Sequence, residues 1–133
     1  MFLNRMTDQE KCSFLGLADA FVRCDDELSE RETALIQCLA DEAGVSKSEM
    51  TTSADPIDLA RTFKTRSSRV CALLELIGLG HADSDYSTDE SQFVQQLASE
   101  WGMSEAELAV LENWVLRLLA VMEEAQSLIE GED

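Results

Sequence analysis

The sequence predicts an all-α fold, in a single compact helical domain of about six to seven helices that spans residues 1–133. Three observations support this prediction. Ala, Leu and Glu are plentiful, while the chain has one proline and six glycines. Capping-box patterns, in which a hydroxyl residue precedes Glu by three positions, recur along the chain. Apolar residues follow these boxes at helical spacing, and no segment alternates as a strand does.

The first half of the chain contains two clear helix starts. Thr7 and Glu10 form a capping box, and the helix that follows is expected to run to about Arg23. A second box lies at residues 29–32, and its helix is expected to stop at Gly44, because glycine is the usual residue just past a helix end. These signals predict two consecutive amphipathic helices.

Two shorter helices are expected in the middle of the chain. Asp55 and Pro56 open one over residues 57 to about 64, with proline in the first turn, where its missing N–H costs nothing. The next is expected over residues 68 to about 79, because the glycines near its end, at positions 78 and 80, are typical stop signals.

The last two helices start with further capping boxes. One follows Ser87 and is expected to stop at Gly102, and the other follows Ser104. The final helix is long, and the spacing of its apolar residues predicts that one face is buried. The residues expected on that face are Leu108, Leu111, Val115, Leu118, Leu119 and Met122. Trp101 and Trp114 are also expected to pack in the core.

An internal repeat relates the two halves. Shifting the chain by 58 residues aligns 24–50 with 82–108 without a gap, and ten of the 27 pairs are identical. We therefore expect two helical repeats, about 7–50 and 68–108, related by a pseudo-twofold axis and followed by the long C-terminal helix. Two copies are too few for a solenoid.

Each repeat contains an acidic loop that leads directly into a capped helix. The loops are 25–32 and 83–90, and they share the form Asp-x-acidic-apolar-Ser-x-x-Glu. Ca²⁺ and Mg²⁺ prefer several carboxylate and carbonyl oxygens, so paired acids in a turn are candidate ligands. The predicted metal ligands are Asp25, Glu27, Glu32, Asp83, Asp85 and Glu90. The loops lack the glycine and the glutamate spacing of an EF-hand.

Helix capping is the competing explanation for part of this motif. It accounts for the serine and the last glutamate of each loop, Ser29 with Glu32 and Ser87 with Glu90. It does not account for the acidic pairs that precede the caps, whose mutual repulsion would cost stability unless water, a base or a cation relieves it. The metal hypothesis therefore depends mainly on those pairs.

At these loops the chain resembles the TerB family of tellurite-resistance domains. The resemblance rests on the size, the helical character and the repeated acidic loop, and it covers nearly the whole sequence from about Phe2. It implies a divalent-cation site, Ca²⁺ in particular, at the six acidic residues named above, and a role in tellurite or other stress resistance. Where the family has a glycine in each loop, this chain has Asp26 and Ser84, and both make a turn with positive φ costlier.

The net charge narrows the class of partner. The chain has 10 basic and 27 acidic residues, a net charge of −17. We do not expect direct binding to nucleic acid or to a bare anionic membrane, because both require a cationic face on the protein. A protein partner with a basic surface is expected instead. The basic cluster at Arg61, Lys64, Arg66 and Arg69 is expected to pair with the protein's own acids.

The remaining features predict a cytoplasmic, non-catalytic protein. Four cysteines without metal-site spacing are expected to be reduced thiols. No secretory signal or membrane-spanning segment is expected. With one histidine and no Gly-rich phosphate loop, enzymatic activity is not expected. The leading hypothesis is a Ca²⁺-binding regulatory or scaffold domain. The alternatives are a metal-independent acidic protein-interaction module and a small hydrolase that uses metal-bound water. The sequence leaves the oligomeric state open.

Overall fold

The computed structural model is all-helical and compact, and it describes residues 2–24, 30–46, 55–82 and 86–131, except for the side chains of residues 30–32. A short 3₁₀ helix, η1 (Leu3–Arg5), precedes six α-helices in this part of the chain, which contains no strand. The helices are α1 (Asp8–Arg23), α2 (Glu30–Ala43), α3 (Pro56–Ala60), α4 (Arg66–His81), α5 (Thr88–Glu100) and α6 (Glu105–Glu130).

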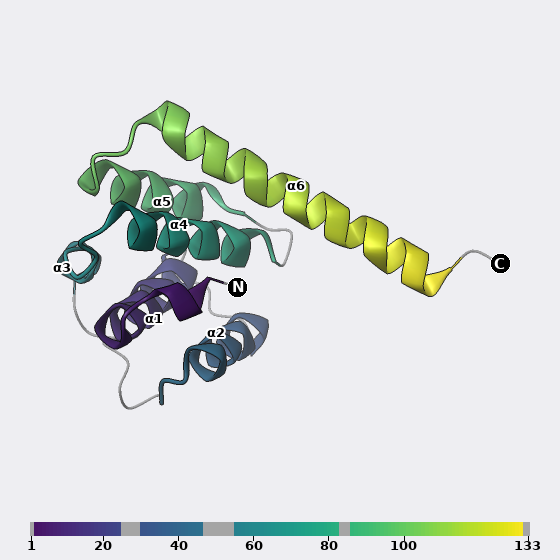
Figure 1. Cartoon of the computed structure of the whole chain (residues 1–133), viewed down its shortest axis with the longest axis horizontal. Helices are drawn as coiled ribbons and strands as arrows, with labels where there is room; N and C mark the ends of the chain where they lie inside the picture. The colour runs from purple at the N-terminus through teal and green to yellow at the C-terminus, as the bar shows by residue number, and fades with distance from the viewer. Residues whose placement is uncertain (1, 25–29, 47–54, 83–85, 132–133) are drawn as a thin grey trace.

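Helix α1 lies at the centre of the arrangement. It packs against α2, α3, α4 and α5, while α6 packs across α4 and α5. Figure 1 shows α6 along one side of the molecule, α4 and α5 beneath it, and α1 beneath these, with α2 on the outer side of α1. Because α1 has neighbours on several sides, most of its apolar residues are fully buried, among them Phe14, Leu15, Leu17 and Phe21.

The predicted helix starts of α1 and α5 are confirmed. The Thr7 hydroxyl accepts a hydrogen bond from Glu10 N at 3.1 Å, and the Glu10 carboxylate accepts one from Thr7 N at 2.9 Å. Ser87 and Glu90 form the same pair of bonds at 3.1 and 2.9 Å. Each box satisfies two backbone N–H groups that the helix itself leaves unpaired.

The two predicted glycine stops are also confirmed, and they are built in the same way. Gly44 and Gly102 have φ values of 74° and 71°. The next residue in each case donates its N–H to the carbonyl five residues earlier, Val45 to Ala40 at 3.0 Å and Met103 to Ala98 at 2.9 Å. This is the Schellman arrangement, which uses the freedom of glycine at positive φ. The 58-residue repeat therefore extends to the local geometry of these two helix ends.

One predicted boundary is confirmed closely and one is wrong. Helix α4 was expected to end at about residue 79, near its glycines, and it ends at His81, directly after Gly80. Gly80 also serves packing, since a Cβ there would lie 2.6 Å from the Tyr86 ring and 2.9 Å from the Phe21 ring. Helix α3 ends at Ala60 rather than near residue 64. A turn follows it and buries Phe63 completely.

Helix α6 extends well beyond the rest of the molecule (Figure 1). Its 26 residues correspond to about 39 Å at 1.5 Å per residue. Leu108 and Val115 are buried, whereas every residue from Ala120 to Glu130 is exposed. The prediction that Met122 is buried is wrong, because its side chain is 54% exposed. Helices α4 and α5 are shorter than α6, so its last turns have no helix beneath them.

The tryptophans pack as the sequence predicts. Trp101 donates its Nε1–H to the Ala60 carbonyl at 2.9 Å, and its ring lies 5.4 Å from that of Phe63. Trp114 lies 5.9 Å from Phe2. No helix in the described part of the chain combines the length and the apolar character needed to cross a bilayer.

Candidate functional site

Most of the predicted metal ligands lie outside the described residues. These are Asp25, Glu27, Asp83 and Asp85. Glu32 lies in α2, but its side chain is not among those described. Within residues 2–24, 30–46, 55–82 and 86–131, no three His, Cys, Asp or Glu side chains gather closely enough to hold a metal ion. The metal site itself therefore stays a prediction, and the evidence that bears on it comes from the residues on either side of the loops.

Glu90 is the one predicted ligand whose side chain is described. It is 5% exposed, and one of its carboxylate oxygens accepts the Ser87 N–H. Its place in the fold is thus that of the capping glutamate, as the sequence predicts. A carboxylate held in this way has limited freedom to turn towards an ion in the loop, so the acids that precede the cap become the principal candidates.

Described residues within or close to the two loops pack together around Gly80. Phe21 lies three residues before Cys24, the C-cap of α1. Its ring packs beside Gly80, near the end of α4. Tyr86, which follows the second acidic pair, lies against the same face of Gly80. Cys24, the residue before Asp25, is among the groups whose charge raises the pKa of the Tyr86 phenol. The residue before the first acidic loop and one residue of the second are therefore associated with this cluster.

The cluster is apolar and its tyrosine is neutral. Burial, and secondarily the negative charge of Glu112, raises the pKa of the Tyr86 phenol. The hydroxyl is buried and forms no hydrogen bond with the described residues, although the Ser91 side chain lies near it. The His81 ring lies 4.3 Å from the Tyr86 ring and Phe93 lies 5.5 Å from Phe21. A raised pKa removes the phenol from acid–base chemistry near neutral pH.

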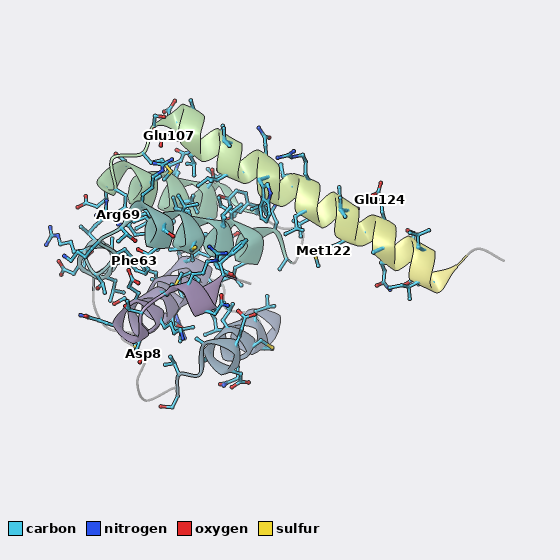
Figure 2. The ribbon with its side chains drawn as sticks, in the orientation of Figure 1. Asp8, Phe63, Arg69, Glu107, Met122 and Glu124 are labelled. Atoms are coloured by element: carbon cyan, nitrogen blue, oxygen red, sulfur yellow. The ribbon has the colours of Figure 1, made fainter. Side chains whose placement is uncertain are left out.

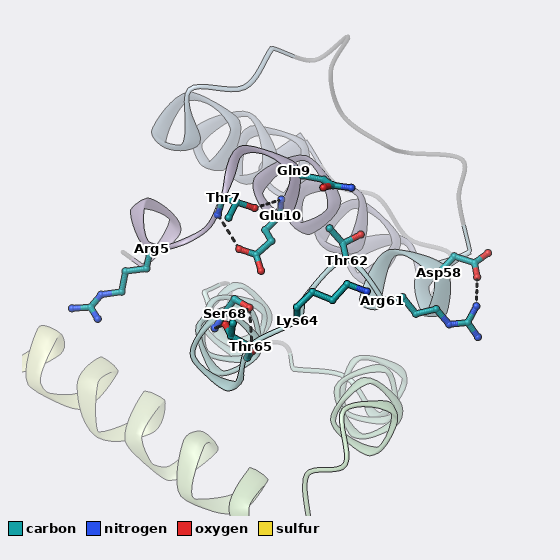
Figure 3. Close-up of a pocket in the computed structure, with 10 residues that line it drawn as sticks. All are labelled: Arg5, Thr7, Gln9, Glu10, Asp58, Arg61, Thr62, Lys64, Thr65 and Ser68. Carbon is teal, nitrogen blue, oxygen red and sulfur yellow. Dashed lines mark hydrogen bonds and ion pairs between the residues drawn. The ribbon is translucent and has the colours of Figure 1, made fainter.

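A polar pocket of about 650 Å³ lies elsewhere, between η1, the start of α1 and the segment from α3 to α4 (Figure 3). Its walls include the basic residues Arg5, Arg61 and Lys64, and the carboxylates of Glu10 and Asp58. Glu10 is already engaged with the start of α1, and Arg61 pairs with Asp58 at 3.1 Å. Capping and ion pairing therefore account for much of the charge in this pocket.

The predicted pairing of the basic cluster is confirmed for two of its four residues. Arg61 pairs with Asp58, and Arg66 pairs with Glu107 at 3.0 Å, which joins α4 to α6. Arg69 instead donates to the Phe63 carbonyl at 2.9 Å and so fixes the turn after α3. Among the described residues, no ion pair within 4.0 Å involves Lys64, whose side chain extends across the pocket in Figure 3.

All four cysteines lie in the described part of the chain, and none of them forms a disulfide. Cys71 is buried, and this burial raises the pKa of its thiol. A thiol with a raised pKa is a poor nucleophile and a poor metal ligand near neutral pH, because the thiolate is the reactive form. Cys71 therefore acts as a core residue.

Sequence reasoning missed one surface. The exposed end of α6 and the ends of α2 and α4 present apolar side chains that no described helix covers. The signal was present in the sequence, since Met122 and Ile129 continue the apolar stripe of α6 towards its C-terminal end.

Comparison with known proteins gives no match, whether to a family model, to a curated protein or to a solved structure.

Proposed function

We propose that this protein is a non-catalytic scaffold domain that binds a divalent cation, Ca²⁺ above others, through its two acidic loops. The observation that carries the proposal is the convergence of the loop flanks. Phe21 and Tyr86 meet at Gly80, and Cys24 lies near Tyr86. A shared ion would then relieve the repulsion between the acids of the two loops, Asp25 and Glu27 with Asp83 and Asp85.

The proposal also includes a duplicated pair of helices. Two helix pairs, α1 with α2 and α4 with α5, would be related by an approximate twofold axis that brings the loops together. The matched ends of α2 and α5 support this relation, because the same two backbone bonds close both helices. The likeness to TerB domains, and with it a role in stress resistance, belongs to the proposal as well.

Calorimetric titration with Ca²⁺ and Mg²⁺ tests the site. We expect the Asp25→Asn/Asp83→Asn variant to lose most of the binding, since carboxylate oxygens are the preferred ligands. The matched control is Glu100→Gln/Glu105→Gln, which removes the same charge from two exposed positions on α5 and α6. Equal loss of cation binding in both variants would indicate general charge attraction. If the parent protein binds neither ion at submillimolar concentration, the site is excluded.

A shared ion and two separate ions are distinguished by stoichiometry. One ion per chain, abolished by either single substitution, is the expected result. Two ions per chain, each lost with its own substitution, would contradict the shared site while leaving a cation-binding role in place.

The metal-independent interaction module is the second candidate. The exposed apolar end of α6 favours it, since such a surface on a monomeric protein commonly marks an interaction site. A pull-down that weakens with salt but is unchanged by a chelator would favour this module over cation-dependent regulation.

A further inference from the structure

Two shallow grooves meet at the end of α4. The first lies between α2 and α4, encloses about 250 Å³ and is lined mainly by apolar groups, among them Leu35, Leu39 and Leu79. The second lies between α4 and the outer half of α6, where Leu119 and Met122 contribute to its wall. Ala82 borders both. We refer to the two grooves together, with Ala82 as the described residue they share, as the α2–α6 groove.

The side of α6 that borders this groove is the apolar one. Figure 2 shows Met122 on the side of α6 towards the other helices and Glu124 on the opposite side. Beyond the groove, Ile129, which lies seven residues after Met122 and on the same face of the helix, is 78% exposed. The apolar stripe of α6 therefore continues outward from the groove along a helix face.

Comparison of aligned positions in the two sequence repeats indicates how fully this surface is covered. Leu39 of α2 corresponds to Leu97 of α5 in the 58-residue repeat. Leu97 is 2% exposed, since α5 lies among α1, α3, α4 and α6, whereas Leu39 is half-buried and opens on the groove. At this position the helix face is less covered in the first half than in the second, and an added helix there would cover it further.

The charges at the edge of the α2–α6 groove, its rim, indicate which kind of partner it would bind. Three glutamates border the groove, Glu42, Glu75 and Glu123, and no Lys or Arg lines it among the described residues. The net charge of −17 makes a second copy of this chain an electrostatically unfavourable occupant. An apolar floor with an acidic rim matches a helix that carries apolar residues on one face and Lys or Arg at the edges.

From these observations we infer that the α2–α6 groove is a docking site for a basic amphipathic helix of a partner protein. Apolar side chains of the partner would pack on Leu39, Leu79 and Met122. Its Lys or Arg residues would lie at the glutamate rim. The inference goes beyond the proposed cation site and requires no ion, so either can fail without the other.

The test is fluorescence anisotropy with a designed peptide of about 18 residues, or five helical turns, with Leu along one face and Lys along the other. A scrambled peptide of the same composition is the ligand control. We expect the amphipathic peptide to bind, with an affinity that falls as salt is raised, and the scrambled peptide to bind at least ~tenfold more weakly, because its apolar residues cannot all reach the groove.

Single substitutions on α6 locate the site. Met122→Gln should weaken peptide binding about tenfold, the effect of one lost apolar contact. Val110→Gln, at a 65% exposed position on the same helix, is the matched control and should bind as the parent does. Both positions are exposed, so neither change should unfold the protein, and circular dichroism checks this.

Three results would overturn the inference. Equal binding of the scrambled peptide would indicate charge attraction alone. Equal weakening by Met122→Gln and Val110→Gln would place the site elsewhere. Sedimentation of the parent as a dimer that Met122→Gln converts to a monomer would show that a second copy of the chain fills the groove.

Discussion

Helices α2 and α5 share a sequence pattern and a manner of ending, but they differ in how deeply they are buried. Both end at a glycine with positive φ, and both bury an alanine at the same register, Ala40 and Ala98, with 1% and 2% exposure. Helix α5 lies among four other helices, whereas α2 packs mainly against α1 and η1. The comparison shows that local sequence determines where a helix stops, while its neighbours determine what the helix buries.

The aligned leucines provide the strongest test of this difference. Leu97→Ala should lower the free energy of unfolding by about 2–5 kcal/mol, because it removes a fully enclosed side chain. Leu39→Ala should cost only about 1 kcal/mol, because that side chain is only partly buried. Urea denaturation of both variants measures the difference between their unfolding free energies. Equal losses would mean that α2 is covered as fully as α5.

Two glycines of α4, Gly78 and Gly80, test the contact at the end of this helix. Gly80→Ala should destabilise the fold by about 1–2 kcal/mol, since the rings of Tyr86 and Phe21 must shift to admit the methyl group. Gly78→Ala, where a Cβ would meet nothing within 4 Å, should instead stabilise it by roughly 0.5–1 kcal/mol.

Thermal denaturation measures this pair. A gain in stability from both substitutions would show that the rings near Gly80 move freely, and it would weaken the case for convergence of the two loops.

Removal of the α5 cap should have a smaller effect. Ser87→Ala deletes the acceptor for the Glu90 N–H and should cost about 1 kcal/mol. Ser99→Ala, at an exposed position near the other end of α5, should change stability by less than about 0.5 kcal/mol. Equal losses in the two variants would mean that the Ser87 hydroxyl contributes nothing as a cap.

The ion pair between α4 and α6 should have the smallest effect. Arg66 and Glu107 are 71% and 44% exposed, so Arg66→Gln should cost no more than about 0.5 kcal/mol at low salt. High salt should abolish that difference, because it screens exposed charges. A larger cost that persists in high salt would mean that Arg66 contributes packing as well as charge.

The parts of the fold that depend on local chemistry were predictable. The capping boxes at Thr7 and Ser87 and the stops at Gly44 and Gly102 involve residues within a few positions of each other. The errors fall where distant residues decide the outcome. Helix α3 was expected to run to about residue 64, but it ends at Ala60, and Phe63 in the turn after it is buried against the ring of Trp101.

In the candidate site, too, the features set by neighbouring residues were predictable and those set by distant residues were not. The capping role of Glu90 follows from its own neighbours in sequence, and the structure confirms it. The exposure of Met122 was not predictable from helical spacing, since spacing identifies an apolar face but not the length of the helices beneath it. The groove beside α2 has the same origin, because the pattern of α2 alone matches that of a buried helix.

The central position of α1 has a consequence for how the protein is made. Ribosomes synthesise a chain from its N-terminus, so α1 emerges before the helices that cover it. Helix α2 follows it directly, but its other neighbours α3, α4 and α5 end at residues 60, 81 and 100. The apolar side chains of α1, Phe14 and Phe21 among them, therefore stay partly uncovered until residue 100 has been translated. During that interval we expect the nascent protein to present apolar surface of the kind that chaperones bind.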